Sequence, residues 1–135
     1  MKTVAHVAFA VSTTEFVELS EIERFADGSG YVSMIRVGSG EFACSGRKFF
    51  FGELPRFLDD LKKSYRALRS YAELRTQYEE DFVRFEFRSL GHIVVTGLLR
   101  EYGNLNRKLQ FGFEADQSFL PPFIAALESA VAELK

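Results

Sequence analysis

Two segments of the chain carry the same helical pattern of apolar positions. The first has apolar residues three or four positions apart at Leu54, Phe57, Leu58, Leu61, Tyr65 and Leu68. The second repeats this spacing at Leu120, Phe123, Ile124, Leu127, Val131 and Leu134. Such a stripe is typical of an amphipathic helix, and Pro55 and Pro121 fall where a first helical turn tolerates proline. The pattern predicts helices over about 53–69 and 118–134.

Most of the remaining chain alternates between apolar and polar residues with period two, as antiparallel strands with one buried face do. In the second half, alternation predicts strands at 71–76, 79–90, 92–101 and 107–114. In the first half it predicts strands at 4–11, 16–25, 31–37 and 41–51. Glycine-containing segments at 27–30, 38–40, 91 and 103–104 are predicted turns.

The predicted fold class is therefore α+β. We expect a mainly antiparallel sheet of about eight strands with the two helices on one face. Each half is predicted as four strands followed by a helix, which suggests a pseudo-twofold repeat with halves 1–70 and 71–135 inside a single domain, 1–135. The likeness of the two helices has another explanation, because any two amphipathic helices with a proline in the first turn resemble each other.

Composition and charge narrow the class of protein. The chain has 135 residues, of which 47% are hydrophobic, and its 17 basic and 19 acidic residues give a net charge of -2. This balance argues against nucleic acid or a membrane surface as partner. No apolar run approaches the length of a membrane span, and the N-terminal segment lacks the apolar region of a secretion signal. With one cysteine, Cys44, no internal disulfide is possible. We expect a cytoplasmic protein.

No catalytic or metal-binding motif stands out in the sequence. His6 and His92 are the only histidines, both on predicted strand faces, and no serine or cysteine nucleophile motif accompanies them. The acidic cluster at 79–81 lacks the spacing of a calcium loop and is interpreted as a charged turn. We predict no catalytic residue, no metal, no cofactor and no enzymatic activity.

Polar residues of the second half share the strand faces opposite the apolar ones. Pairing of these strands would collect them on one sheet face: Arg84, Glu86, Arg88, His92, Thr96, Arg100 and Lys108. Antiparallel sheets often turn such a face to water, so an ordinary solvent-exposed face is one interpretation. The other interpretation is a surface that binds a protein partner.

Two further functions remain open on the sequence. Fifteen Phe and no Trp could line a pocket between helices and sheet for a small ligand or an enzyme substrate, or could form a phenylalanine-rich core. The segment 4–11 has no acidic or basic residue other than His6. It could be an edge strand through which two copies form a homodimer.

A combination of features in the second half resembles a known family. It consists of the helix with Leu54, Phe57 and Leu61, the alternating strands, the Gly91-x-Ile93-x-Val95 segment, and the pattern L-x-F-x-F-x-x-D-Q-S-x-L at 109–120. This combination is similar to the WapI-like immunity proteins, which protect bacteria from polymorphic, contact-delivered toxins. The resemblance covers roughly residues 50–134 and implies a non-enzymatic cytoplasmic protein that neutralises a cognate toxin domain by binding it.

Overall fold

The protein contains two four-stranded antiparallel sheets, each a meander whose strands lie in chain order. The structure is a computed structural model and describes residues 4–76, 80–101, 105 and 107–135. The first sheet consists of β1 (Ala5–Ala10), β2 (Glu15–Arg24), β3 (Tyr31–Ser39) and β4 (Phe42–Phe51). The second consists of β5 (Ser70–Arg75), β6 (Phe82–Phe87), β7 (His92–Glu101) and β8 (Arg107–Asp116).

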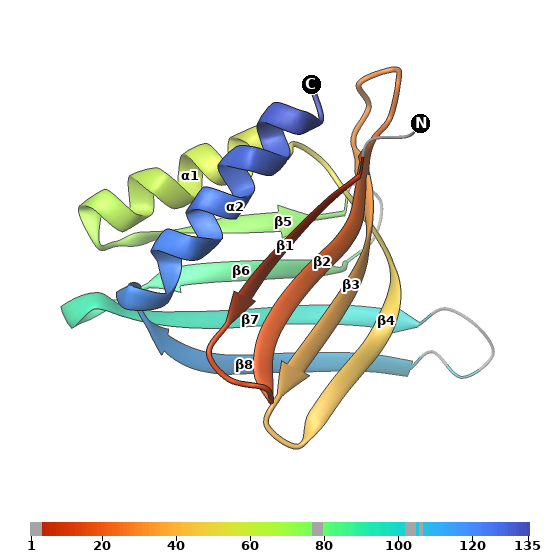
Figure 1. The fold of residues 1–135 in the computed structure, drawn as a ribbon. Helices are drawn as coiled ribbons and strands as arrows, with labels where there is room; N and C mark the ends of the chain where they lie inside the picture. The colour runs from red at the N-terminus through yellow and green to blue at the C-terminus, as the bar shows by residue number, and fades with distance from the viewer. Residues whose placement is uncertain (1–3, 77–79, 102–104, 106) are drawn as a thin grey trace.

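One helix follows each sheet, α1 (Leu54–Ala67) after β4 and α2 (Leu120–Glu133) after β8. The α+β class and the order of four strands and a helix, twice, are confirmed. The eight strands form two sheets rather than one, and the strands of the first cross those of the second (Figure 1). Alternation assigns residues to faces but does not determine which strands pair, so this division is not visible in the sequence.

The predicted turns are observed where the structure describes them. Gly40 turns the chain between β3 and β4 with φ +66°, a conformation that favours glycine, while Gly38 and Ser39 belong to β3. Gly91 closes a short 3₁₀ turn before β7 with φ +76°. The turn predicted at Gly103-Asn104 lies outside the described residues.

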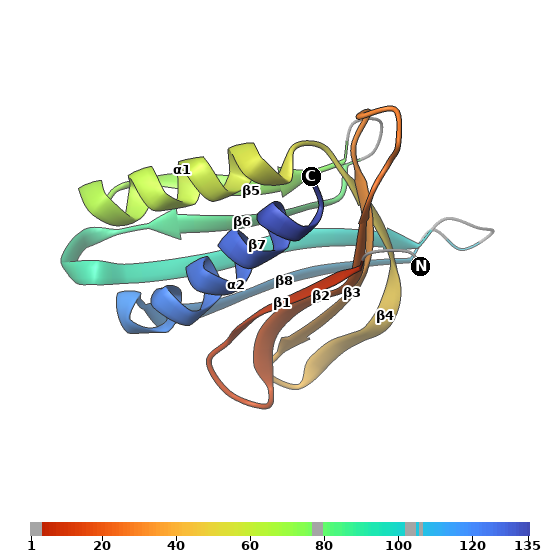
Figure 2. The ribbon, with the colours of Figure 1, turned by 45° about the horizontal axis from the view of Figure 1, so that its top comes forward.

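Each helix lies along the edge strand of the other half's sheet, and α2 also contacts the sheet of its own half, where Phe123 lies 5.3 Å from Phe85 of β6 between ring centroids. α1 follows the first sheet but lies beside β5, from which only Leu68 and Arg69 separate it. α2 follows the second sheet but lies beside β1, and the two helices contact each other (Figures 1 and 2). Leu68 ends α1 in a left-handed conformation, which lets the chain reverse at once into β5. The two halves are thus joined by an exchange of helices.

A cluster of phenylalanine rings forms the centre of one core that includes residues of both sheets and both helices. The ring centroid of Phe9 in β1 lies 5.2 Å from that of Phe85 in β6 and 5.5 Å from that of Phe123 in α2. Phe57 in α1 lies 5.7 Å from Phe85. Such pairs contribute about 1 kcal/mol each beyond the area they bury. These rings fill the space between helices and sheet, so they form a phenylalanine-rich core there.

A serine adds a polar contact between the two sheets, where the end of β3 meets β8. The hydroxyl of Ser39, at the end of β3, donates to the carbonyl of Gly112 in β8 at 2.7 Å and accepts from the Gly112 N–H at 3.2 Å. Both backbone groups of one β8 residue are therefore satisfied by a side chain of the first sheet.

The strand at 4–11 is an edge strand as predicted, because β1 pairs only with β2 in its sheet. α2 lies beside it (Figure 1). Homodimer formation through this edge stays a prediction, which sedimentation of the purified protein would test. Among the described residues, no helix is long and apolar enough to cross a membrane.

Candidate functional site

All the predicted site residues lie on the side of the second sheet opposite its buried side chains. The register sets Arg84 opposite Thr96 and Arg100 opposite Lys108, and Glu86 and His92 share their side. Arg88 directly follows Phe87, the buried last residue of β6, so alternation places it on the same side as Arg84 and Glu86. We refer to this surface as the outer face. It also includes Tyr71, Glu73, Arg75, Phe82, Val94, Leu98, Gln110, Glu114 and Asp116.

An arginine-aromatic cluster occupies the β5–β6 side of the outer face. The guanidinium carbon of Arg84 lies 4.6 Å from the ring centroid of Tyr71 and 5.7 Å from that of Phe82. Arg75 lies 4.9 Å from the Phe82 centroid. Tyr71 is half exposed. Cation–π pairs of this kind hold large side chains in place at a surface, and the sequence analysis missed Tyr71, Phe82 and Arg75, although the alternation of 71–76 and 82–87 places them on this face.

Glu73 organises this cluster from between the two arginines. Its carboxylate accepts from Arg75 Nε at 2.8 Å and from Arg84 Nε at 2.9 Å. Partial burial would raise the pKa of Glu73, but the hydrogen bonds and positive charges of Arg75 and Arg84 outweigh it and hold the pKa below its ordinary value. The carboxylate therefore stays ionised at neutral pH, and both arginines keep their positions.

Basic side chains are in excess at one end of the outer face and acidic ones at the other, where Arg88 also lies, paired with Glu86 at 3.1 Å. Arg75, Arg100 and Lys108 lie towards one end of the strands. Glu114 and Asp116 lie towards the other, where hydrogen bonds from the side chain and backbone of Ser118 lower the pKa of Asp116. A surface with this polarity would orient a partner of opposite polarity during encounter.

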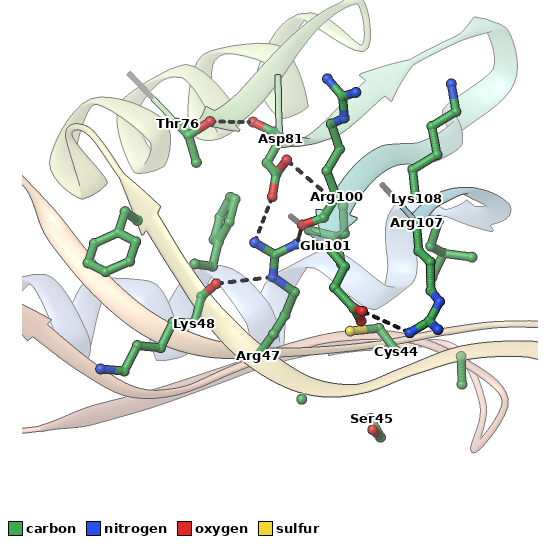
Figure 3. A pocket seen from close by; sticks show the side chains of 16 residues that line it. Cys44, Ser45, Arg47, Lys48, Thr76, Asp81, Arg100, Glu101, Arg107 and Lys108 are labelled. Atoms are coloured by element: carbon green, nitrogen blue, oxygen red, sulfur yellow. Dashed lines mark hydrogen bonds and ion pairs between the residues drawn. The ribbon is translucent and has the colours of Figure 1, made fainter. Parts of the chain in front are cut away.

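A cleft of about 560 Å³ opens at the basic end, between β4 and the ends of β7 and β8 (Figure 3). Residues 43–50 of β4 line one side of it. The remaining lining residues are Thr76, Asp81, Leu99, Arg100, Glu101, Arg107, Lys108 and Leu109. Because Arg100 and Lys108 belong to both surfaces, the outer face and the cleft are continuous.

A buried ion pair between the two sheets forms part of the cleft wall. The Asp81 carboxylate is fully buried, and its Oδ2 lies 3.1 Å from Nη2 of Arg47 in β4. Its Oδ1 accepts from the Arg100 N–H at 3.3 Å. Arg47 also donates to the carbonyls of Arg100 and Lys48 (Figure 3). Arg47 thereby connects β4 to β7, and the pair is part of what holds the sheets together.

The interpretation of 79–81 as a charged turn is wrong for Asp81. Its carbonyl accepts from the Thr76 N–H at 3.1 Å and from the Thr76 hydroxyl at 3.2 Å, and its side chain is inside the protein. Glu80 is exposed and pairs with Arg100 at 2.8 Å, while Glu79 lies outside the described residues. The burial of Asp81 depends on Arg47, which is distant in sequence and in the other sheet, so no local signal could have revealed it.

The histidines and the cysteine are separate from one another. His6 is exposed on β1, with Nε2 3.5 Å from Glu18, and His92 is exposed at the start of β7. Cys44 is half-buried beside the cleft. In the part of the chain that the structure describes, no group of three or more His, Cys, Asp or Glu side chains is placed to hold a metal ion. The outer face and cleft offer charged, aromatic and hydrogen-bonding groups for binding.

A second hollow, of about 940 Å³, lies between the β2–β3 turn and the start of α1. Its charged lining residues are all exposed: Arg24, Glu53, Arg56, Asp59 and Lys135. We favour the cleft over this hollow because the cleft contains a buried charge held by the fold, whereas exposed side chains are free to rearrange.

Comparison with known protein families gives a match over nearly the whole chain. The sequence model described as the immunity protein WapI-like family matches residues 5–135. The match therefore extends through the first four strands, beyond the segment of about 50–134 on which the sequence resemblance rested. No curated protein and no solved structure matches the chain.

Proposed function

Because this chain belongs to the immunity protein WapI-like family, we propose that it neutralises a cognate bacterial toxin by binding the toxin domain. The match over nearly the whole chain supports an immunity role. It names no partner, so the toxin and the binding surface are part of the proposal. The protein binds the toxin domain in the cytoplasm and blocks its activity, without catalysis of its own.

The outer face is the proposed toxin-binding surface, and one observation carries this choice. Arg84 is held over the exposed ring of Tyr71 by Glu73, so an arginine and a tyrosine are presented together in fixed positions. Arginine, tyrosine and tryptophan dominate the few residues that carry most of the energy of protein interfaces. Side chains that are already ordered lose less entropy when a partner binds.

The first experiment is affinity capture of the tagged protein from extract of its native cells, followed by mass spectrometry. The expected result is one partner in near-stoichiometric amount, the C-terminal part of a secreted protein. That domain, expressed alone, should stop bacterial growth, and co-expression of this chain should restore growth. Growth arrest that co-expression does not relieve would contradict the proposal.

Charge reversal tests the surface. Arg84→Glu and Arg100→Glu should each weaken the complex at least tenfold, because a central contact of the interface is lost and repulsion replaces it. Arg56→Glu makes the same change of charge on α1, away from the outer face, and should leave affinity unchanged. Titration calorimetry gives the affinities, and thermal unfolding checks that each variant is folded. Unchanged affinity in both outer-face variants would rule out this surface.

A further inference from the structure

We propose that the free edge of β4 is a docking site for an extended, acidic segment of a protein partner, which adds to the first sheet as a fifth strand inside the cleft. The inference rests on the proposed function, because it supplies a second contact for the same toxin. Beyond the proposed function, it specifies the conformation and the charge of the toxin segment that binds.

The cleft lies along an edge of β4 and not along one of its faces. Among the described strands, β4 is the last of its sheet and pairs with β3 alone. All eight residues from 43 to 50 line the cleft, whereas a cavity against one face of a strand would contact alternate residues. Within the described residues, no second strand pairs with the backbone of this segment, although the Lys48 carbonyl already accepts from Nε of Arg47. An edge of this kind is a template for strand addition.

The charge of the lining selects the occupant. Five basic side chains line the cleft against two acidic ones. Arg47 pairs with Asp81, and Arg107 pairs with Glu101 at 3.0 Å. Arg100 pairs with Glu80, outside the lining, at 2.8 Å. Lys48 and Lys108 are exposed, and no described carboxylate lies within ion-pair distance of either. The net positive charge favours carboxylates in the added strand.

Apolar side chains stand at both ends of the same strand. Phe42 is 68% exposed at its start and Phe50 is 50% exposed near its end. An added strand of about eight residues spans about 26 Å and presents alternate side chains to each face. The register places Lys48 and Phe50 on one face of β4 and Phe42 on the other. A segment that alternates carboxylates with apolar residues would set its carboxylates on the face of Lys48 and its apolar side chains on the face of Phe42.

An edge protected against aggregation is the competing explanation. Proteins place lysines and bulges on edge strands to discourage pairing, and β4 has both, Lys48 and a register shift between Cys44 and Arg47. Lysines repel a basic strand and have no net charge interaction with a neutral one, but they attract an acidic strand. The two explanations therefore differ in how binding depends on the charge of the added segment.

The probe is a synthetic nine-residue peptide that alternates glutamate with valine, labelled for fluorescence anisotropy, beside a matched peptide with lysine for glutamate. The acidic peptide should bind, and the lysine peptide should bind at least tenfold more weakly. In amide NMR spectra, the acidic peptide should shift the signals of residues 43–50. Equal binding of the two peptides, or shifts confined to other segments, would overturn the inference.

Strand addition is separated from simple charge attraction by two further peptides, N-methylated at the odd or at the even positions. Only one edge of the added strand donates to β4, so one methylated peptide should lose binding and the other should keep it. Equal binding of both would show that charge alone is responsible, and would overturn the inference.

Variants locate the site. Lys48→Glu and Lys108→Glu should each weaken binding of the acidic peptide severalfold, while Arg56→Glu on α1 should not. If the toxin is captured and neutralised but the acidic peptide does not bind, the inference fails and the proposed function stands. If the peptide binds at β4 but no toxin is neutralised, the proposed function fails and the docking site stands.

Discussion

Glu73 determines how the arginines of the outer face are presented. Its single carboxylate holds Arg75 against Phe82 and Arg84 against Tyr71. Without this acceptor, two long side chains would have many conformations, and a partner would have to order them on binding. An acidic residue that contacts no partner can therefore contribute to affinity through its neighbours.

Glu73→Gln tests this role through pH. The lowered pKa means that the carboxylate's contribution to the free energy of unfolding is full above its ordinary pKa of 4.5 and is lost as pH falls through the folded value. At pH 7 the variant should be less stable by about 0.5–1 kcal/mol, as expected for a partly exposed pair. The difference should shrink as pH falls below 4.5.

Urea unfolding at pH 7 and at successively lower pH measures this difference. Glu86→Gln is the control at pH 7, because Glu86 pairs only with the exposed Arg88 among the ion pairs described. A gap between wild type and Glu73→Gln that stays constant down to pH 3 would show that the carboxylate's charge is not the cause.

At the level of the elements, β4 has two separate roles in the molecule. Towards its end, Phe49 and Phe51 are buried in the core. In its middle, Arg47 reaches the second sheet through Asp81 and the Arg100 carbonyl. The strand is therefore fixed at its inner side while its outer edge faces the cleft. A fixed edge is a better template for an added strand than a mobile one.

Arg47→Met should destabilise the protein by about 3 kcal/mol, because it removes the guanidinium that lies 3.1 Å from the buried Asp81 carboxylate. Asp81→Asn should also destabilise it, and the double variant should lose less than the sum of the two single losses. Urea unfolding of the four proteins gives the coupling energy. Additive losses would show that Arg47 and Asp81 do not act as a pair.

The sequence predicts the elements better than their contacts. β7 spans His92–Glu101 as the alternation predicts, and α1 lies inside the stripe from Leu54 to Leu68. The composition of the outer face follows from the same alternation. The burial of Asp81, the division into two sheets and the exchange of helices depend on contacts between distant segments, which a local pattern does not encode.

At the level of the whole molecule, the exchange of helices makes the two halves depend on each other. Phe57 of α1 contacts Phe85 of β6, and Phe123 of α2 contacts both Phe85 and Phe9 of β1. A half taken alone would expose apolar side chains that the other half covers in the full chain. The two stretches 1–70 and 71–135 are thus repeats of element order, and each lacks the contacts of a complete core.

Neither half should fold when expressed alone. Residues 1–70 and 71–135, produced separately, should lack the dispersed amide NMR spectrum of a folded protein, while their mixture should regain it if the fragments associate. The full chain is the reference. A dispersed spectrum from either fragment alone would contradict this dependence and would favour two independent domains.

The arrangement of α2 beside β1 also brings the last helix next to the first strand, so the order of elements could be closed into a cycle. α2 runs antiparallel to β1 and ends on the side where β1 begins, just as α1 does with β5 (Figures 1 and 2). The two-residue connection between α1 and β5 therefore has an unconnected counterpart between α2 and β1. A circularly permuted chain that starts at Ser70 and joins α2 to β1 by a short linker would keep the same neighbours. We expect it to unfold at a similar urea concentration, and failure of this permutant to fold would show that the order of the halves matters to the protein.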